Sequence, residues 1–389
     1  MRVFFIMNDS FPNGMASVSR VKCYAKALMT AGAECEVIAT RRLEQNRTNP
    51  KNAVPKGVYE GIPFRYIGGT TFRRKNHFLR VMNDYIDKVH TLVYLLCHLH
   101  KGDVVYGYAS DQISFINNVI RVAHIKGAKF FKELCELPFG TGEETPKRIE
   151  QRHDMEKTQF PICDGIIPIS DALEAYSRQF TNDTCKYLKV PILVDFDRYN
   201  LEDKSAESEI PYIFHSGTLY EQKDGFLGMI EAFGKACQKI DRPVRFISTG
   251  KKEKSPHVAE IDALIKKYNL QDKVIFTGYL SDDELKDHLQ KASMVIINKA
   301  PNQQNTYCFS TKLGEYMAAG KAIIITRVGE AMNWLTDGKD ALIIPPLEND
   351  TLADAIVRLF SDDELRKALG ENARETCRKS FDYRDWARR

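Results

Sequence analysis

The stretch YCFSTKLGEYMAAGKAIII, Tyr307–Ile325, predicts a helix followed directly by a buried strand. Ser310 or Thr311 suits the N-cap, because a short side-chain oxygen accepts a hydrogen bond from an exposed backbone N–H. Gly320 stands where a left-handed residue commonly ends a helix. Ala322–Ile325 is apolar throughout, which is typical of a parallel strand buried on both faces. The stretch therefore indicates an α/β fold.

The same alternation of strand and helix signals runs through the rest of the chain. The expected strands are 3–7, 35–40, 64–67, 104–106, 129–132 and 165–169, then 212–215, 244–248, 274–277, 294–297 and 322–326. Two separate series of this kind predict two doubly wound domains, at 1–190 and 211–378. The polar segment 191–210 is long for a loop inside one domain and is expected to connect the two.

The composition is that of an ordinary globular protein. The chain has 389 residues, enough for two cores, with 43% hydrophobic and 28% charged residues. A formal charge of +4 is too small to indicate nucleic-acid binding. No apolar run reaches membrane-spanning length, and the amino terminus lacks a signal-peptide pattern. Nine Cys without C-x-x-C or zinc spacing fit a reducing compartment, so a cytoplasmic location is expected.

The helix expected after Ser310 carries two features that suit a nucleotide. Its amino end offers unpaired N–H groups and partial positive charge to a phosphate. Glu315 lies four residues beyond Thr311 on the same helix face, about 6 Å along the axis. A carboxylate there can accept hydrogen bonds from two hydroxyls of a ribose whose phosphates rest at the helix start. From the residues alone, an ordinary surface Glu is an equal alternative.

This segment resembles the nucleotide-sugar site of retaining GT-B glycosyltransferases, specifically glycosyltransferase family four. That family carries two Glu separated by seven residues, then small residues, a Gly, a Lys or Arg, and a strand. Glu315 and the following YMAAGKAII match the second Glu, whereas Tyr307 stands at the position of the first. The resemblance implies that Glu315 holds the donor ribose, and it places Tyr307, Ser310 and Thr311 in the donor site. It also implies two Rossmann-like domains facing a central cleft, with 379–389 starting a helix that crosses back to the first domain.

A loop earlier in the second series extends the resemblance. HSGTLYEQKDG, 215–225, follows an expected strand and precedes an expected helix. In the family a similar loop carries an Arg and then a Lys. Lys223 matches that Lys, whereas Thr218 occupies the place of the Arg, next to Gly217. The resemblance implies that Lys223 is catalytic and pairs with the donor diphosphate, where a charge-assisted hydrogen bond is worth about 1.5–3 kcal/mol.

Two further segments are assigned to the donor site by position. FTGYLSDDEL, 276–285, resembles the family segment whose backbone contacts the nucleobase, which implies that Tyr279 and Leu280 lie there. Gly250 follows the strand 244–248 and is expected to line the same cleft. The acids after Ser281 are better explained as helix-cap and dipole residues than as catalysts.

The amino-terminal domain is expected to bind the acceptor. Gly14 lies in the first βα loop, which in the fold that the resemblance implies faces the donor's phosphates, so Gly14 is a candidate donor-binding residue of this domain. A residue without Cβ lets the backbone approach a ligand closely. ELCELPFG, 133–140, is expected to be a loop, and its position matches a family loop that presents His or an acid to the reacting sugar. Glu133 and Glu136 are therefore candidate catalytic residues, with structural ion pairing as the equal alternative.

The segment TFRRKNHFLR, 71–80, mixes basic and aromatic residues ahead of an apolar helix. Such a mixture can rest on an anionic membrane, where lipid-linked acceptors reside. A helix packed on its own domain with one wet face is the alternative. Contact with the inner face of the membrane therefore stays open, as does the oligomeric state.

Together the patterns and the resemblance predict a glycosyltransferase without a cofactor, and the resemblance implies that it retains the anomeric configuration and needs no metal ion. It would move a sugar from a nucleoside diphosphate sugar, with uridine as the default base, to a glycan, lipid-linked or other hydroxyl acceptor. A non-catalytic nucleotide-sugar binder and a sugar-nucleotide epimerase remain alternatives. No G-x-G-x-x-G follows the first strand, which argues against a Rossmann dehydrogenase. A pairing of Asp195 and Asp197 on a metal ion is less favoured than a turn at the start of the second domain.

Overall fold

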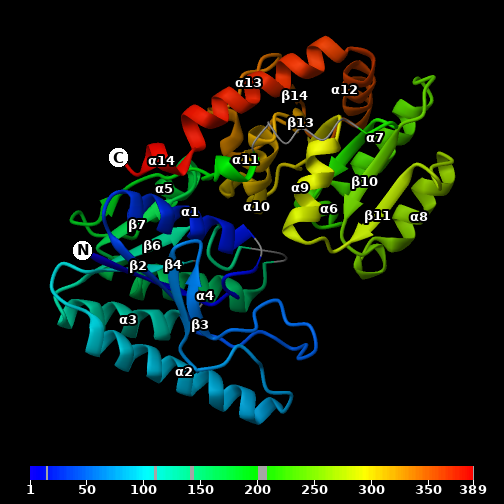
Figure 1. The fold of residues 1–389 in the computed structure, drawn as a ribbon. Helices are drawn as coiled ribbons and strands as arrows, with labels where there is room; N and C mark the ends of the chain where they lie inside the picture. Colours follow the sequence, from blue (N-terminus) through cyan, green and yellow to red (C-terminus); the bar gives the residue numbers. More distant parts are fainter. Residues whose placement is uncertain (15, 109–111, 141–143, 200–207, 389) are drawn as a thin grey trace. The chain divides into compact units, whose positions relative to one another are not determined.

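The computed structural model describes residues 1–389 except 15, 109–111, 141–143, 200–207 and 389. The chain folds into two compact units (Figure 1). Unit 1 comprises Met1–Leu193 together with Tyr383–Arg389, and unit 2 comprises Val194–Asp382. Within the described part of the chain, no helix is both long and apolar enough to cross a bilayer.

Unit 1 is built on a sheet with strand order β3-β4-β2-β1-β5-β6-β7-β8. Its strands are β1 (Arg2–Met7), β2 (Glu34–Ala39), β3 (Lys56–Tyr59), β4 (Ile62–Tyr66), β5 (Val104–Gly107), β6 (Lys129–Leu134), β7 (Gly165–Pro168) and β8 (Lys186–Tyr187). Only β3 among these strands runs antiparallel to its neighbour, β4. The central strand β1 is buried from Val3 onward, as expected for a parallel strand covered by helices on both faces.

Helices cover this sheet, and three of them begin at a residue whose side chain caps the helix. They are α1 (Ala16–Thr30), α2 (His77–His98), α3 (Ile113–Ile125), α4 (Pro146–Thr158), α5 (Asp171–Ser177) and α14 (Tyr383–Trp386). The side chains of Asn76, Thr145 and Ser170 accept hydrogen bonds from the first turns of α2, α4 and α5. α2 lies beside α3 (Figure 1).

Unit 2 has a second parallel sheet, with strand order β11-β10-β9-β12-β13-β14. Its strands are β9 (Tyr212–His215), β10 (Arg245–Thr249), β11 (Val274–Gly278), β12 (Met294–Ile297), β13 (Ala322–Thr326) and β14 (Leu342–Ile344). From β9 the chain adds β10 and β11 on one side of the sheet, and from β12 it adds β13 and β14 on the other. The carboxyl ends of β9 and β12 therefore form the topological switch point, where ligands bind in open α/β sheets.

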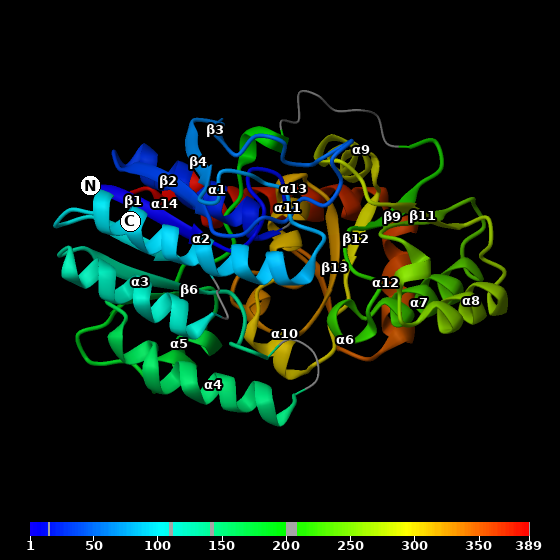
Figure 2. The same ribbon diagram turned by 90° about the horizontal axis from the view of Figure 1, so that it is seen from below.

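The helices of unit 2 bury a large apolar core against this sheet. They are α6 (Glu221–Asp224), α7 (Phe226–Cys237), α8 (Val258–Lys267), α9 (Asp282–Lys291), α10 (Gln303–Tyr307), α11 (Thr311–Ala318), α12 (Asn349–Ser361) and α13 (Asp363–Phe381). α7 packs between α8 and α12 (Figure 2). The fully buried Phe226 and Phe233 of α7 pack against Phe246 of β10, with ring centroids 6.1 and 5.7 Å apart.

The expected α/β architecture is confirmed, with every predicted strand present within about two residues of its position. Gly320 ends α11 with φ of +67°, as its place in the sequence predicted. The short strands β3, β8 and β14 were not predicted. Most of the polar part of the expected connection 191–210 lies outside the described residues. The segment 379–389 is divided between the end of α13, in unit 2, and α14, which packs against α1 in unit 1.

Candidate functional site

The loop after β9 is fastened to its surroundings by backbone hydrogen bonds. Ser216 N donates to the hydroxyl of Tyr316 on α11, at 2.9 Å. Gly217 N donates to Thr249 Oγ1 at the end of β10, at 3.0 Å. The loop therefore lies at the switch point in a fixed position against the first turns of α11.

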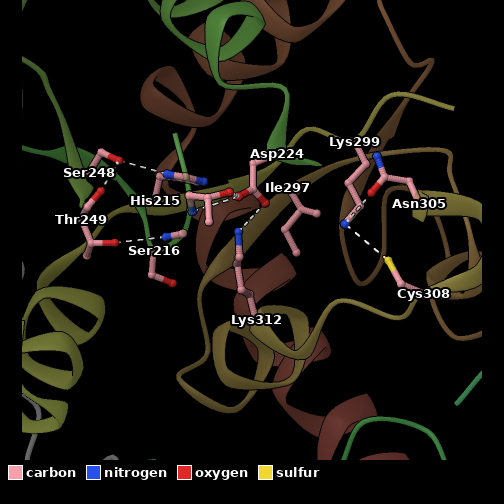
Figure 3. A network of polar contacts seen from close by, with 12 residues as sticks. His215, Ser216, Asp224, Ser248, Thr249, Ile297, Lys299, Asn305, Cys308 and Lys312 are labelled. Carbon is pink, nitrogen blue, oxygen red and sulfur yellow. Dashed lines mark hydrogen bonds and ion pairs between the residues drawn. The ribbon is translucent and has the colours of Figure 1, made fainter. Parts of the chain in front are cut away.

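An ion pair between the half-buried Lys312 and the buried Asp224 stands at the centre of this loop. Lys312 Nζ donates to Asp224 Oδ1 at 2.6 Å (Figure 3). The backbone N and the hydroxyl of Thr218 donate to Asp224 Oδ2 at 3.0 and 2.5 Å. Burial alone would raise the pKa of Asp224, but the Lys312 ammonium holds that pKa well below its usual range. Asp224 thus stays ionised and joins α6, the β9 loop and α11.

Gly217 leaves the space that Lys312 needs. A Cβ added to Gly217 would collide with Lys312 Nζ, so a side chain at this position would displace the ammonium. Thr218, which the resemblance places where the family has an Arg, is occupied by its bonds to Asp224. A cation does reach this loop, but it comes from α11 rather than from the loop itself.

A second lysine approaches from the other side of the switch point. Lys299, two residues after β12, donates through Nζ to Asn305 Oδ1 at 2.9 Å and lies 3.6 Å from Cys308 Sγ (Figure 3). Asn305 is buried and is itself held by the carbonyls of Gln222 and Ala300. Across the residues that the structure describes, no carboxylate pairs with the half-buried Lys299 ammonium.

Lys223 is the third lysine near this point. It is exposed on α6, next to Asp224. Burial lowers the pKa of Lys312, and the ammonium groups of Lys299 and Lys223 lower it further, although Asp224 opposes them. Lys299 and Lys223 are therefore each close enough to Lys312 to repel its ammonium. We call these three lysines and Asp224 the lysine cluster.

Glu315 lies one turn after Lys312 on α11. It is half-buried, and burial raises the pKa of its carboxyl group. The charges nearest to it belong to Arg198, Asp282 and Lys312. Among the described side chains none donates a hydrogen bond to its carboxylate, in contrast to Asp224. An acceptor is thus held at the predicted distance from the helix start with its bonding capacity unused.

The start of α11 has the predicted N-cap residue but not the predicted bond. Ser310 takes the N-cap position with extended backbone, and its side chain makes no capping hydrogen bond. Tyr307 ends the short helix α10, three residues before this cap. The first N–H groups of α11, including that of Thr311, are therefore not satisfied by the Ser310 hydroxyl.

Two glycines bring the neighbouring loops together. Gly250 N donates to Gly278 O at 2.8 Å, and a Cβ on Gly250 would lie 3.5 Å from Gly217 O. Both Gly250 and Gly278 have positive φ, which favours glycine. Tyr279 follows and is 67% exposed, with Lys254 Nζ 5.7 Å from its ring centroid, and Leu280 is half-buried. The loops after β9, β10 and β11 thus meet at one edge of the sheet.

The candidates in unit 1 have a different setting. The expectation that Glu133 lies in a loop is wrong, because β6 continues through Leu134. Glu133 is fully buried, where Arg20 Nε donates to its Oε1 at 2.7 Å and the Tyr106 hydroxyl donates to its Oε2. A carboxylate engaged in this way is a structural ion pair, the alternative reading, and is not available to a ligand. Glu136 lies two residues past β6 and is half-buried.

Gly14 is required for packing in unit 1. A Cβ at this position would overlap the side chain of Val18 on α1 and approach Ser10 O to 3.1 Å. Its absence of a side chain is therefore explained by the close passage of the β1–α1 loop over the start of α1. The donor-binding role expected for Gly14 stays a prediction.

The sequence reasoning missed Lys312, Asp224 and Lys299. Lys312 was visible in the quoted stretch as the residue after Thr311, but its partner Asp224 lies 88 positions away. Asp195, weighed as a metal ligand, accepts from the backbone N of Asp197 at 3.2 Å and so closes a turn. In the described ranges no group of three His, Cys, Asp or Glu is placed to hold a metal ion.

His215, the last residue of β9, adds a buried imidazole to the site. Its Nδ1 lies 3.0 Å from Ser248 Oγ, whereas its buried Nε2 has no partner among the described groups. Burial lowers the pKa of His215 to about 3, and the Lys312 ammonium adds to the effect. The imidazole is therefore neutral at physiological pH.

This neutral imidazole makes the stability of unit 2 depend on pH. The unfolded chain binds a proton at His215 near pH 6.5, but the folded protein does so only near pH 3, so stability falls as the pH drops through this window. We expect His215 to account for a loss of about 2 kcal/mol between pH 7.5 and pH 5. Denaturant unfolding followed by Trp334 fluorescence should show a smaller loss of unfolding free energy between pH 7.5 and pH 5 in His215→Asn than in the wild-type protein. Equal losses in the two proteins would contradict this assignment.

Comparison with known proteins identifies the family of unit 2. The glycosyl transferases group 1 family model matches residues 197–376. A glycosyltransferase of Methanocaldococcus jannaschii, itself uncharacterised, is 27% identical over 210 residues, which are 54% of this chain and 55% of that protein. N-acetyl-alpha-D-glucosaminyl L-malate synthase of Bacillus anthracis is 23% identical over 54% of this chain and 56% of its own. These matches span about half the length of each relative.

Solved structures agree in fold at low sequence identity. Sucrose-phosphate synthase from Thermosynechococcus elongatus matches 99% of this chain and 96% of its own, with a TM-score of 0.75 and 17% identity. Anabaena HepE in complex with UDP matches 100% of this chain and 98% of its own, with a TM-score of 0.68 and 14% identity. The family model of glycosyl transferases group 1 thus matches residues 197–376 within unit 2, and the chain has the GT-B fold of two doubly wound domains.

Proposed function

We propose that the chain is a retaining glycosyltransferase that uses a nucleoside diphosphate sugar and binds its donor at the switch point of unit 2. The observation that carries this proposal is the lysine cluster at the start of α11, with Glu315 one turn further along the same helix. The cluster suits a diphosphate, and Glu315 suits the ribose attached to it.

The charges of the cluster match those of a diphosphate linkage. Lys223, Lys299 and Lys312 contribute three positive charges and Asp224 one negative charge, which leaves +2 at neutral pH. A sugar nucleotide carries one negative charge on each of its two phosphates. The open N–H groups at the start of α11 add a favourable dipole. Lys299 and Lys312 would thus supply the positive charge that the loop lacks at Thr218.

The same charges would serve the chemical step. When the bond from the sugar to the diphosphate breaks, negative charge develops on the leaving oxygen. A preorganised donor at such an oxygen commonly contributes about 2.7–4 kcal/mol to transition-state stabilisation. Lys223 is the exposed member of the cluster and has no carboxylate partner in the described part of the chain, so it is the ammonium best able to meet this charge. Neutralisation by lysines is the reason for proposing transfer without a metal ion.

The finer assignments rest on resemblance. Retention of anomeric configuration follows from the similarity of the Tyr307–Ile325 stretch to family four. Uridine is proposed as the base because solved relatives of the same fold are described as complexes with UDP or UDP-glucose. The names of the curated relatives describe sugar transfer to varied acceptors, including malate. We propose a hydroxyl group of a glycan, a lipid-linked sugar or a small molecule as the acceptor, bound by unit 1.

Release of nucleoside diphosphate from a panel of UDP-, GDP- and ADP-sugars tests the function. We expect release above the rate without protein from at least one donor, increased by a hydroxyl acceptor and unchanged by a chelator. Nuclear magnetic resonance of the product gives its anomeric configuration. Binding without any release would indicate a non-catalytic binder instead. Interconversion of free sugar nucleotides would indicate an epimerase.

Glu315→Gln should weaken nucleotide binding about ten- to hundredfold, because the hydrogen bonds of an ionised acceptor are worth about 1.5–3 kcal/mol. An amide has one accepting oxygen and cannot accept from both ribose hydroxyls equally well. Calorimetric titration with UDP measures the change. A matched titration with 2′-deoxy-UDP should show a smaller difference in affinity between the wild-type and Glu315→Gln proteins. Equal UDP affinities of the two proteins would show that Glu315 does not bind the ribose.

A further inference from the structure

The helix α2 of unit 1 presents apolar side chains to the outside. Their exposed fractions are 74% for Phe78, 42% for Met82, 69% for Tyr85, 40% for Val89 and 45% for Leu96. These residues are spaced by three, four or seven positions along the helix, so they form one stripe about 27 Å long. Leu79, Val81 and Val93 widen the stripe. We call this surface the α2 stripe.

The fully buried positions of α2 include two polar residues, whereas many of its large apolar side chains are exposed, which is unusual for an amphipathic helix on a domain. The buried residues of α2 are Asp87, Thr91 and Leu95. Asp87 is held by Arg42, whose Nε and Nη2 donate to its two oxygens at 2.8 and 2.6 Å. The helix is thus attached to unit 1 by this ion pair, by the Tyr94 hydroxyl, which donates to Glu36 Oε2 at 2.8 Å, and by the buried Leu95, whereas most of its large apolar side chains stay exposed. Large apolar patches of this kind mark an interaction surface.

The charge around the α2 stripe is positive. Arg73, Arg74 and Lys75 directly precede the helix, and Arg80 lies in its first turn. Neither acid of α2 faces outward, because Asp87 is buried and Asp84 is half-buried 3.8 Å from Arg41. The excess extends beyond the helix. Residues 41–101 contain twelve Lys and Arg against four Asp and Glu, a charge of +8, whereas the rest of the chain carries −4.

Two occupants could cover an apolar helical stripe, a second copy of the chain or a bilayer. Self-association would bring two cationic rims together without acidic groups to pair with them, which costs free energy. A bilayer containing anionic lipid satisfies both features at once. Its acyl boundary accepts the apolar side chains, and its headgroups attract the Lys and Arg. Tyr85 also suits the interface, since it combines an apolar ring with a polar hydroxyl.

We propose that the α2 stripe binds the surface of an anionic phospholipid bilayer, with α2 parallel to the membrane plane. The apolar side chains enter the boundary of headgroups and acyl chains, and the segment 73–80 contacts the lipid phosphates. This inference rests on α2 and its charges and does not depend on the proposed function of unit 2. If both hold, sugar transfer takes place at a membrane surface, which favours an acceptor carried by a lipid.

Co-sedimentation of the full chain with vesicles tests the proposal. Vesicles of phosphatidylcholine alone are compared with vesicles that contain equal parts of phosphatidylglycerol and phosphatidylcholine. We expect at least tenfold stronger binding to the anionic vesicles, decreasing as salt is added because charges are screened. The double variant Phe78→Ser with Tyr85→Ser should lose most of this binding. Charge reversal at Arg74 and Lys75 should lower the binding about as much.

A matched control comes from unit 2. Leu347 is 72% exposed, so Leu347→Ser removes a similar apolar group and should leave vesicle binding unchanged. Circular dichroism and UDP-sugar turnover in solution establish that each variant is folded. Absence of binding by the wild-type protein, or undiminished binding by the α2 variants, would overturn the proposal. Light scattering that shows a dimer abolished by Phe78→Ser, without vesicle binding, would assign the stripe to a second copy.

Discussion

Lys223→Ala should lower turnover by about 10²–10³-fold while the protein stays folded, which is the usual effect of removing one preorganised donor from a developing oxyanion. Lys223 is exposed and is not part of the buried ion pair, so its truncation leaves no unpaired charge in the core. The proposed role acts on the transition state. We therefore expect kcat to fall much more than the affinity for UDP. Steady-state kinetics with the best donor, together with UDP calorimetry, separate these two effects.

Two other lysine variants test whether the loss of turnover is specific to Lys223. Lys266→Ala, an exposed lysine on α8, should behave like the wild-type protein. Lys312→Met should differ from both, because it leaves Asp224 buried without its ammonium and so also lowers stability. A Lys223→Ala enzyme with turnover near that of the wild type would show that the leaving group is met by another residue. The proposal that unit 2 binds a sugar nucleotide would remain testable through UDP binding.

Arg20→Met should destabilise unit 1 by about 3–5 kcal/mol, the typical effect of removing one partner from a buried ion pair. The side chains of Arg20 and Glu133 are 2% and 0% exposed, and their 2.7 Å bond is part of a larger network. Arg20 also donates to the carbonyls of Val190 and Pro191 at 2.9 and 2.6 Å. Its loss therefore leaves both a carboxylate and two carbonyl groups without their donor.

Unfolding by denaturant can be followed for unit 1 alone. The chain has two Trp, and Trp386 packs against the core of unit 1 whereas Trp334 lies in unit 2. A Trp334→Phe background therefore reports unit 1 through Trp386. Adding Glu133→Leu to Arg20→Met should recover part of the loss, because the isolated buried charge is then removed. A change below about 1 kcal/mol in the single variant would contradict the structural role of the pair.

The central parallel strands could be read from the sequence because burial on both faces makes them continuous apolar runs. β9 and β12 were predicted with the bounds that the structure shows. β8, of two residues, and β14, of three, are too short to carry a periodic signal. β3 alternates between exposed and half-buried residues, so no continuous apolar run marks it.

Local patterns also located the helix start and Glu315, but they could not reveal long-range pairing. Asp224 meets Lys312 across 88 positions, and Arg20 meets Glu133 across 113. A sequence shows that such residues exist and does not show which acid faces which base. The position of ELCELPFG predicted a loop for Glu133, because nothing local to Glu133 reveals the buried Arg20 that pairs with it in the strand. The apolar content of α2 was visible, but not that it faces outward.

The membership of α14 in unit 1 has a consequence for biosynthesis. α14 packs against α1, and Trp386 joins the core that β1 and α1 begin. The ribosome makes α14 only after the whole of unit 2, so unit 1, most of which is synthesised first, is completed by a segment that is made after unit 2. A nascent chain halted after unit 2 would leave a patch on α1 open to chaperones, and synthesis of Tyr383–Trp386 would close it.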